Sequence, residues 1–359
     1  MGGKLDNAVR KWKNMAVSGQ FDTIPKVPSV RECAALFHIS HATASKLYTL
    51  LANEGWVKKI PSKGIYLNRK YLSGGKKLFF PFLFSKENFQ QDSVIRAILQ
   101  KVLDVCAKNK TVCQWQLTQD EVLSQADKTR DGVLLFIRRT GSSSANSDFA
   151  KELLPHFGNR LVLIDEEYTD HTLQCHCFGT DKNTAWDEFV HVFQAQRYKK
   201  ILIVGSSICP NHWLTLADFL RERYGLAAEN ICLNASNFTA GSIACSYFKK
   251  KSPLLAEFSG QILVIVSSAF FAPGVRKAFE ESGISGDIFS CENREFYDYP
   301  DKKGYFTSLE NNIVRTSGEA AETLCRILQG KEDRRLNIQI PTKLIIRQSV
   351  SPPPDKNNG

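Results

Sequence analysis

The net positive charge of this chain is confined to its first 77 residues. That stretch holds 14 Lys and Arg against 4 Asp and Glu, a balance of +10 that equals the net charge of the whole chain. The remaining residues carry equal numbers of acidic and basic side chains. At 359 residues the chain is too long for one ordinary core. We therefore expect a small basic part and a larger neutral part, and a polyanion such as DNA as the partner of the basic part.

The composition is typical of a cytoplasmic protein without a membrane partner. The longest apolar runs, residues 78–84 and 262–266, are far too short to span a membrane, and no signal-peptide pattern opens the sequence. The ten Cys show no paired C-x-x-C spacing, as expected for reduced, buried thiols. The sequence contains no glycine-rich phosphate loop and no catalytic serine elbow, so we expect neither an enzyme nor a cofactor.

The first 68 residues predict a winged helix-turn-helix. Apolar residues recur at helical spacing over residues 5–17. Ser29 and Ser40 are suitable N-caps for a second and a third helix, and the third is expected from about His41 to Asn53. Residues 56–67 indicate two short strands around a Ser-Lys-Gly turn.

This segment resembles the N-terminal domain of the GntR family of bacterial repressors. The matching stretches are VPSVRECAALFHISHATAS at 27–45, NEGWV at 53–57 and SKGIYL at 62–67. The resemblance implies DNA contacts from the start of the second helix, the N-terminal end of the third and the hairpin. The residues carried over are Arg31, Ser40, His41, Thr43, Ser45, Lys46, Lys63 and Gly64. The first turn of such a helix reaches base edges, and its free N–H groups attract phosphate.

Two departures from the family pattern affect which DNA sequence could be recognised. The family usually has Arg where this chain has His41, and often Arg where it has Ser45. Because bidentate Arg–guanine contacts are the commonest base-specific contacts, the DNA sequence read by relatives does not transfer to this chain.

The rest of the chain predicts an α/β fold with parallel sheets. Residues 69–77 are basic, contain Ser-Gly-Gly and are expected to form a linker. From 78 to 350, apolar strand-like runs alternate with amphipathic stretches of helix length, which indicates sheets covered on both faces. The strand-like runs are 78–84, 132–137, 161–165, 200–205, 262–266 and 287–291. The helical stretches include 92–108, 147–157, 182–197, 212–224, 271–282 and 316–330. The Pro-rich residues 351–359 are expected to be a disordered tail.

The order of these stretches resembles the effector domain of the LacI/GalR family, which has the fold of periplasmic sugar-binding proteins. The supporting stretches include DGVLLF at 131–136, LVLIDEEY at 161–168, FGTDKNTAWDEFVHVF at 178–193, YKKILIVG at 198–205 and GYFTSLENN at 304–312. The resemblance implies two lobes with crossovers near 178, 312 and 340, a ligand in the crevice between them, and a homodimer. A GntR-type reader joined to such a domain is the arrangement of arabinose-type repressors.

The second resemblance also implies a set of ligand-binding positions. They are Phe84, Asp165, Asn211, His212, Trp213, Thr215, Ser268, Glu292 and Asn311. The family's usual Arg is replaced by Thr215, its Asn-Asp pair by Ser267-Ser268 and an Asp by Glu292. This loss of charged anchors favours a neutral ligand, and we expect a saccharide stacked on Trp213 or Phe84.

Two clusters of reactive side chains have less specific patterns. His171, Cys175, His176 and Cys177 suggest a metal site, but alternate residues of a strand face opposite sides and no second ligand pair follows at zinc-like spacing, so we expect no metal. Cys209 with His212 lacks an orienting acid, which favours a role in a pocket wall over nucleophilic catalysis.

Together these patterns predict a ligand-responsive regulator of transcription, in particular a repressor, that binds a palindromic operator as a homodimer. Three alternatives remain open. The body could be an aminotransferase-like domain holding pyridoxal phosphate, the pocket could have lost its effector, or the chain could be a sugar-binding protein alone.

Overall fold

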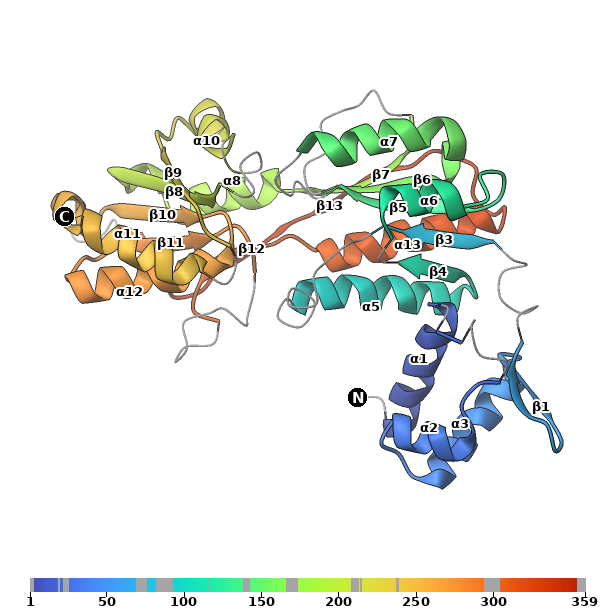
Figure 1. Ribbon diagram of the computed structural model, residues 1–359. Helices are drawn as coiled ribbons and strands as arrows, with labels where there is room; N and C mark the ends of the chain where they lie inside the picture. Colours follow the sequence, from blue (N-terminus) through green and yellow to red (C-terminus); the bar gives the residue numbers. More distant parts are fainter. Residues whose placement is uncertain are drawn as a thin grey trace. The chain divides into compact units, whose positions relative to one another are not determined.

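Three helices and a hairpin form the N-terminal segment, residues 3–68, in the computed structural model of the protein (Figure 1). The helices are α1 (Lys4–Val17), α2 (Val30–Leu36) and α3 (His41–Asn53). The antiparallel strands β1 (Val57–Ile60) and β2 (Gly64–Leu67) follow. These elements lie where the apolar spacing and the N-caps place them in the sequence.

An aromatic cluster forms the core of the N-terminal segment. The buried indole of Trp12 on α1 has its ring 5.1 Å from Phe21, 6.2 Å from Tyr48 on α3 and 6.5 Å from Trp56 beside the hairpin. Ring pairs at these distances stabilise a core beyond the burial of their surface. The Tyr48 hydroxyl also donates a hydrogen bond to the carbonyl of Pro28. Helix α1, helix α3 and the hairpin are thereby fixed to one another.

The chain divides into two compact units. Unit 1 comprises residues 1–137, 148–179 and 313–338, and unit 2 comprises 138–147, 180–312 and 339–359. The N-terminal segment belongs to unit 1. The structure describes residues 3–18, 20–21, 26–68, 76–81, 93–115, 117–137, 143–165, 174–207, 213, 215–236, 239–293 and 304–353.

Unit 1 contains a six-stranded sheet in the order β13-β7-β6-β5-β3-β4. Its strands are β3 (Lys77–Phe80), β4 (Val112–Trp115), β5 (Gly132–Ile137), β6 (Leu161–Asp165), β7 (His176–Asp181) and β13 (Asn337–Pro341). The pairs from β4 through β3, β5 and β6 to β7 are all parallel. The helices of this part are α5 (Ser93–Lys108), α6 (Gln119–Gln125), α7 (Ser143–Phe157) and α13 (Ile313–Leu328).

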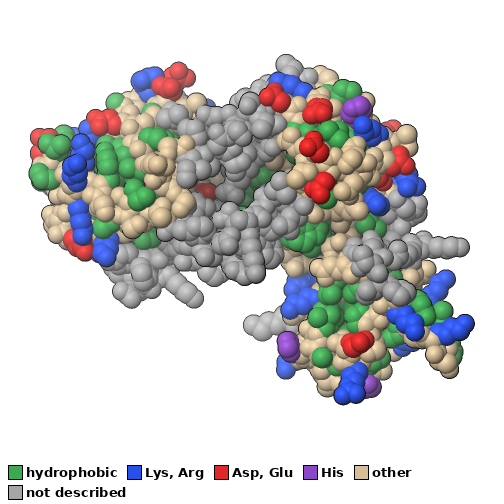
Figure 2. All heavy atoms as spheres, viewed as in Figure 1, with side chains coloured by type: hydrophobic (Ala, Val, Ile, Leu, Met, Phe, Trp, Pro, Cys, Tyr) green, Lys and Arg blue, Asp and Glu red, His purple; other side chains and the backbone are tan. Residues whose placement is uncertain are grey.

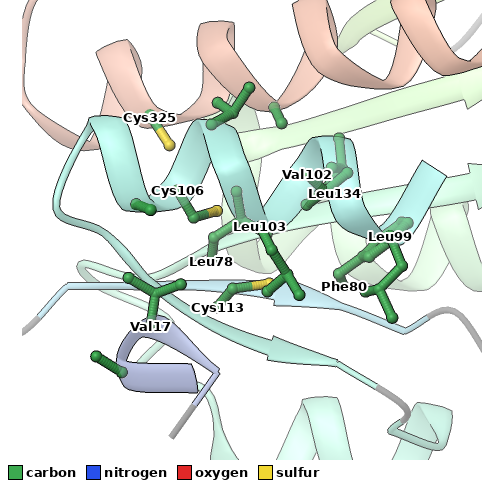
Figure 3. Packing of buried hydrophobic residues seen from close by; sticks show 14 of the residues in the cluster. Val17, Leu78, Phe80, Leu99, Val102, Leu103, Cys106, Cys113, Leu134 and Cys325 are labelled. Carbon is green, nitrogen blue, oxygen red and sulfur yellow. The ribbon is translucent and has the colours of Figure 1, made fainter. Parts of the chain in front are cut away.

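Helices cover both faces of the unit 1 sheet. Leu78 and Leu134 of the strands pack with α5 and α13 on one face, as Figure 3 shows from close by. Phe79 and Val133, which alternate with them along the strands, pack with α6 and α7 on the other face. Successive side chains of a strand point to opposite faces, so strands that are apolar throughout require a helical layer on each side.

Unit 2 repeats this architecture with the strand order β14-β12-β11-β10-β8-β9. The strands are β8 (Lys200–Ser206), β9 (Glu229–Leu233), β10 (Ile262–Val266), β11 (Asp287–Ser290), β12 (Thr307–Glu310) and β14 (Lys343–Ile345). Helices α11 (Ala240–Leu255) and α12 (Ala272–Ser282) pack on one face, and α8 (Asn183–Val192) and α10 (Leu216–Tyr224) on the other. Short 3₁₀ turns lie at Gly158–Arg160, Ala195–Arg197, Ala256–Phe258 and Ala269–Phe271.

The predicted α/β class with parallel sheets is confirmed, but several details differ. Strand β14 runs antiparallel to β12, so the sheet of unit 2 is not wholly parallel. The strand expected over 78–84 ends at Phe80, and the helix expected over 182–197 ends at Val192. The sequence did not predict β4, β9 or α11. None of the described helices is both long and apolar enough to cross a membrane.

The close crossing of α11 and α12 generates a stability prediction. A methyl group added at Gly274 would lie 1.9 Å from the backbone oxygen of Gly241, whereas one added at Gly241 would meet its nearest neighbour at 3.5 Å. We expect Gly274→Ala to lower the free energy of unfolding by about 1–3 kcal/mol because the helices must separate. Gly241→Ala is the matched control and should be neutral or stabilising by up to about 1 kcal/mol, since Ala favours a helix. Urea unfolding measures both, and equal midpoints for the two variants would contradict the close packing.

Candidate nucleic-acid interface and ligand site

The first turn of α3 is closed by a side-chain cap. The Ser40 hydroxyl accepts a hydrogen bond from the Thr43 backbone N–H at 3.1 Å and lies 2.8 Å from the Thr43 hydroxyl. Ser40 satisfies one of the free N–H groups at the start of the helix, which is what an N-cap does. The positions before and after this turn are exposed, so α3 presents a short-chained polar end to solvent.

All but one of the eight residues expected to contact DNA are exposed. The exposed residues are Arg31, Ser40, His41, Ser45, Lys46, Lys63 and Gly64, whereas Thr43 is half-buried by the cap. They come from the start of α2, the first turns of α3 and the hairpin. Figure 2 shows Lys and Arg side chains over the N-terminal segment.

Arg31 is positioned by the cap of α2. The Ser29 backbone N–H donates to the Glu32 carboxylate at 2.7 Å, and the Ser29 hydroxyl accepts from the Glu32 N–H at 3.3 Å. These hydrogen bonds to Ser29, first from its backbone and then from its side chain, lower the pKa of the Glu32 carboxyl. The carboxylate therefore stays ionised while it closes the start of α2, one residue from Arg31.

Two lysines in or beside the hairpin were missed by sequence reasoning. The Lys59 ammonium on β1 donates to the Thr49 hydroxyl of α3 at 3.4 Å, so this charge lies beside α3. The side chain of Lys26 lies next to Gly64, where an added methyl would be 3.4 Å from it. Gly64 has φ +111°, a conformation that side-chain-bearing residues rarely adopt. The excess of basic residues in the first 77 was the only signal that could have found these two lysines.

In unit 2, a hydrogen bond joins two residues that are expected to bind ligand. The Ser268 hydroxyl, just beyond β10, donates to a carboxylate oxygen of Glu292 at 3.0 Å, and the Ala269 N–H donates to the same oxygen at 3.4 Å. Glu292 follows β11. Both groups therefore lie at the carboxyl ends of neighbouring parallel strands, the edge where open α/β sheets bind ligands.

A second polar network lies at the same edge and was not predicted. The Asn293 amide donates to the Glu310 carboxylate at the end of β12 at 2.7 Å. The guanidinium of Arg347 donates to the Asn293 side-chain oxygen at 2.8 Å, to the Ser308 hydroxyl at 3.0 Å and to the Phe306 carbonyl at 2.8 Å. With Glu292 and Glu310, the edge is rich in hydrogen-bond acceptors, which suits a ligand that carries hydroxyl groups.

Of the other expected ligand residues, Trp213 lies in the core and Asn311 directly follows Glu310 at this edge. Trp213 is only 2% exposed; its ring covers Gly205, where an added methyl would lie 2.0 Å away, and its N–H donates to the Ser206 carbonyl at 3.2 Å. The expected stacking of a sugar on Trp213 is corrected accordingly, because the ring packs in the core of unit 2. Thr215 is exposed before α10, and Asn311 is half-buried after β12.

Several residues singled out in the sequence either lie outside the residues that the structure describes or pack in the core of unit 1. Phe84, Asn211, His212, His171 and Cys209 are outside the described residues, as is the side chain of Asp165 at the end of β6. Cys175 and Cys177 pack in the core of unit 1, and His176 accepts a hydrogen bond from the Leu336 N–H at 3.2 Å. Burial lowers the pKa of His176. No group of metal-binding side chains occurs among the residues that were described.

No model of a protein family matches the chain, and no curated protein matches it either. Solved structures do match. A probable maltose operon transcriptional repressor from Staphylococcus aureus has a TM-score of 0.58 and 14% identity, covering 76% of this chain and 97% of its own. A transcriptional regulator in complex with cellobiose has a TM-score of 0.57 and 11% identity, covering 90% and 99%. A LacI-family regulator from Enterococcus faecium with bound ribose has a TM-score of 0.55 and 16% identity, covering 77% and 99%.

These similarities establish the fold. The two α/β units with parallel sheets have the periplasmic-binding-protein-like architecture of LacI-family transcriptional regulators. At these identities the likeness concerns the fold alone.

The Arg347 network generates a prediction about unit 2. Arg347→Ala leaves the oxygens of Asn293, Ser308 and Phe306 without their charged donor, so the free energy of unfolding should fall by about 1–3 kcal/mol. Arg221→Ala is the control, because the Arg221 side chain is exposed and pairs with Asp218 on the same helix, and it should change stability by less than about 0.5 kcal/mol. Chemical unfolding followed by circular dichroism compares them, and a loss no larger than that of the control would show that the network is dispensable.

Proposed function

We propose that the chain is a DNA-binding transcriptional regulator, with the N-terminal segment as a winged helix-turn-helix of the GntR type. The observation that carries the proposal is the exposed, capped start of α3 beside a basic hairpin, joined to a body with the fold of LacI-family regulators. The body is neutral, so non-specific attraction to DNA comes from the N-terminal segment. Repression is the mode of action we favour.

In the proposed interface, α3 enters the major groove and the hairpin follows the backbone. His41 and Ser45 face base edges from the first turns of α3. Arg31 and Lys63 bind phosphates from either side, and Gly64 allows close approach of the hairpin. Lys59 adds charge between the hairpin and α3.

The phosphate contacts can be tested through their dependence on salt. Each lost phosphate contact should reduce the slope of log binding constant against log salt concentration by roughly 0.9, because fewer counterions are released. We expect this for Arg31→Ala and for Lys63→Ala, measured by fluorescence anisotropy with a labelled duplex at several salt concentrations. Lys250→Ala, an exposed lysine of α11 in unit 2, is the matched control and should leave the slope unchanged. Unaltered slopes for Arg31→Ala and Lys63→Ala would remove both from the interface.

We further propose that a small neutral ligand, in the first instance a saccharide, controls the affinity for DNA. Two regulators of this fold carry cellobiose and ribose. The acceptors at the strand ends of unit 2 support hydroxyl recognition, and Ser268 holds Glu292 in place for it. A position between the lobes, as the sequence predicts, remains part of the proposal. We also propose a homodimer, because a palindromic operator has two half-sites and requires two DNA-binding segments.

Regulation follows from population shift. The ligand changes DNA affinity only by as much as its own affinity differs between the two states of the protein. The burial of Trp213 favours one alternative, a regulator whose site has lost its effector, because it removes a surface on which a sugar could stack.

A thermal-shift screen separates these two possibilities. Binding to the native state raises the unfolding temperature by mass action, so a neutral mono- or disaccharide that binds should raise it further as its concentration increases, approximately with the logarithm of the concentration above Kd. Ribose and cellobiose are the first probes. Glu292→Gln should weaken the binding of a hit by about 1.5–3 kcal/mol, since it replaces a charged acceptor. Glu257→Gln, exposed at a 3₁₀ turn of unit 2, is the control. If no sugar shifts the wild-type protein, the effector part of the proposal fails and the DNA-binding part is unaffected.

A further inference from the structure

The last turn of α1 packs outside the N-terminal segment, against the sheet part of unit 1. The side-chain amide of Asn14 donates to the carboxylate of Asp104 on α5 at 2.9 Å, and the Gln100 amide donates to the same oxygen at 2.8 Å. Val17 is fully buried in one cluster with Leu103 of α5 and Cys113 of β4, and Figure 3 shows it beside them. We call this contact of Asn14 and Val17 with α5 and β4 the α1–α5 clasp.

The N-terminal segment has buried aromatic residues of its own, away from the clasp. Its own core consists of Trp12, Phe21, Tyr48 and Trp56, all within the segment. The clasp uses the last turn of α1, where Ala16 and Val17 connect this aromatic cluster to the core under α5 and β4.

The clasp leaves the proposed DNA-binding face uncovered. Arg31, His41 and Lys63 are exposed in the whole chain, with the clasp closed. Docking therefore does not block these residues. Its effect is to fix the direction in which α3 faces relative to α5.

The chemistry of the clasp is that of a contact that can open. Asn14 is 6% exposed, and its side-chain oxygen is buried with no partner among the described residues. A buried acceptor without a hydrogen bond destabilises the closed form relative to one in which water reaches it. Asp104 is half-buried, and both hydrogen bonds to its carboxylate come from neutral amides rather than from a cation.

We propose that the α1–α5 clasp is a reversible docking contact that sets the orientation of the N-terminal segment on unit 1. With the clasp closed, α3 has a fixed direction; with it open, only the covalent connection after Asn68 restrains the segment. The regulatory meaning rests on the proposed function: two segments of fixed direction engage two half-sites at a higher effective concentration than two loosely held ones. A ligand state that favours closure then raises DNA affinity without touching the interface.

Hydrogen exchange on the full-length protein tests the docking itself. Asp104→Ala and Asn14→Ala should each speed exchange at the amides of residues 14–17 by about tenfold, the size expected for one buried hydrogen bond. The double variant should add little to either single one, since both remove the same contact. Asp104→Asn keeps an acceptor oxygen and should restore slow exchange. Peptides of α13 report on the fold of unit 1 and should be unchanged in all variants.

Matched controls are available on α1 and on a helix of unit 1 outside the clasp. Asn7→Ala removes an exposed side chain of α1, and Glu152→Ala removes an exposed carboxylate of α7. Neither should alter exchange at residues 14–17. Exchange in Asp104→Ala that equals that of the controls would overturn the clasp.

DNA binding separately tests whether the clasp orients the N-terminal segment. The probes are duplexes selected by the wild-type protein from a random pool, with either both half-sites or one. Asp104→Ala should weaken binding to the two-site duplex by about fivefold to tenfold and leave the one-site duplex within about twofold. An equal loss on both duplexes would overturn the orienting role. If the wild-type protein selects no DNA, the proposed function fails, and hydrogen exchange still decides whether the clasp exists.

Discussion

The burial of parallel strands on both faces is the constraint on which the rest of the structure depends. Strands such as β5 and β10 are apolar at every position, so helices must cover each sheet on two sides. Polar side chains are then excluded from the sheet faces and appear where the strands end. Ser268, Glu292 and Glu310 stand at such ends because the chain can be polar there without entering the core. The ligand site we propose is a consequence of how the sheet is covered.

This constraint also explains how much of the fold could be predicted from the sequence. Strands β5, β6 and β10 were found because each is a continuous apolar run, and α3 because Ser40 marks its start. Strand β9 escaped because it lies at the edge of its sheet with mostly exposed residues, which breaks the run. Helix α11 escaped because its three consecutive lysines and a proline obscure the apolar stripe.

The candidate site was predictable only in part, for a related reason. Ser268 and Glu292 were named from their places after two strands, and the structure joins them by a hydrogen bond. Arg347 was missed because it reaches Asn293 across 54 residues of sequence, and no local pattern reports such a pairing. Trp213 was assigned to the ligand because aromatic rings often bind sugars, but the space above Gly205 takes its ring into the core. Local pattern identifies which residues reach a strand end; packing decides which of them remain accessible there.

The connection of the two units bears on how a ligand signal could reach the N-terminal segment. Glu310 ends β12 in unit 2, and only Asn311 and Asn312 separate it from α13, the first helix after the chain returns to unit 1. Helix α13 packs closely on α5: a methyl group at Gly318 would lie 2.5 Å from the Lys101 side chain. Helix α5 in turn holds Asn14 through Asp104. A continuous path of covalent bonds and packed helices thus joins the acceptor-rich edge of unit 2 to the α1–α5 clasp. Such a path carries coupling only if one of its elements has two states of similar free energy. The clasp is the element we propose for this role, because it buries an Asn14 oxygen that has no partner among the described residues, whereas α13 and α5 meet through buried apolar side chains.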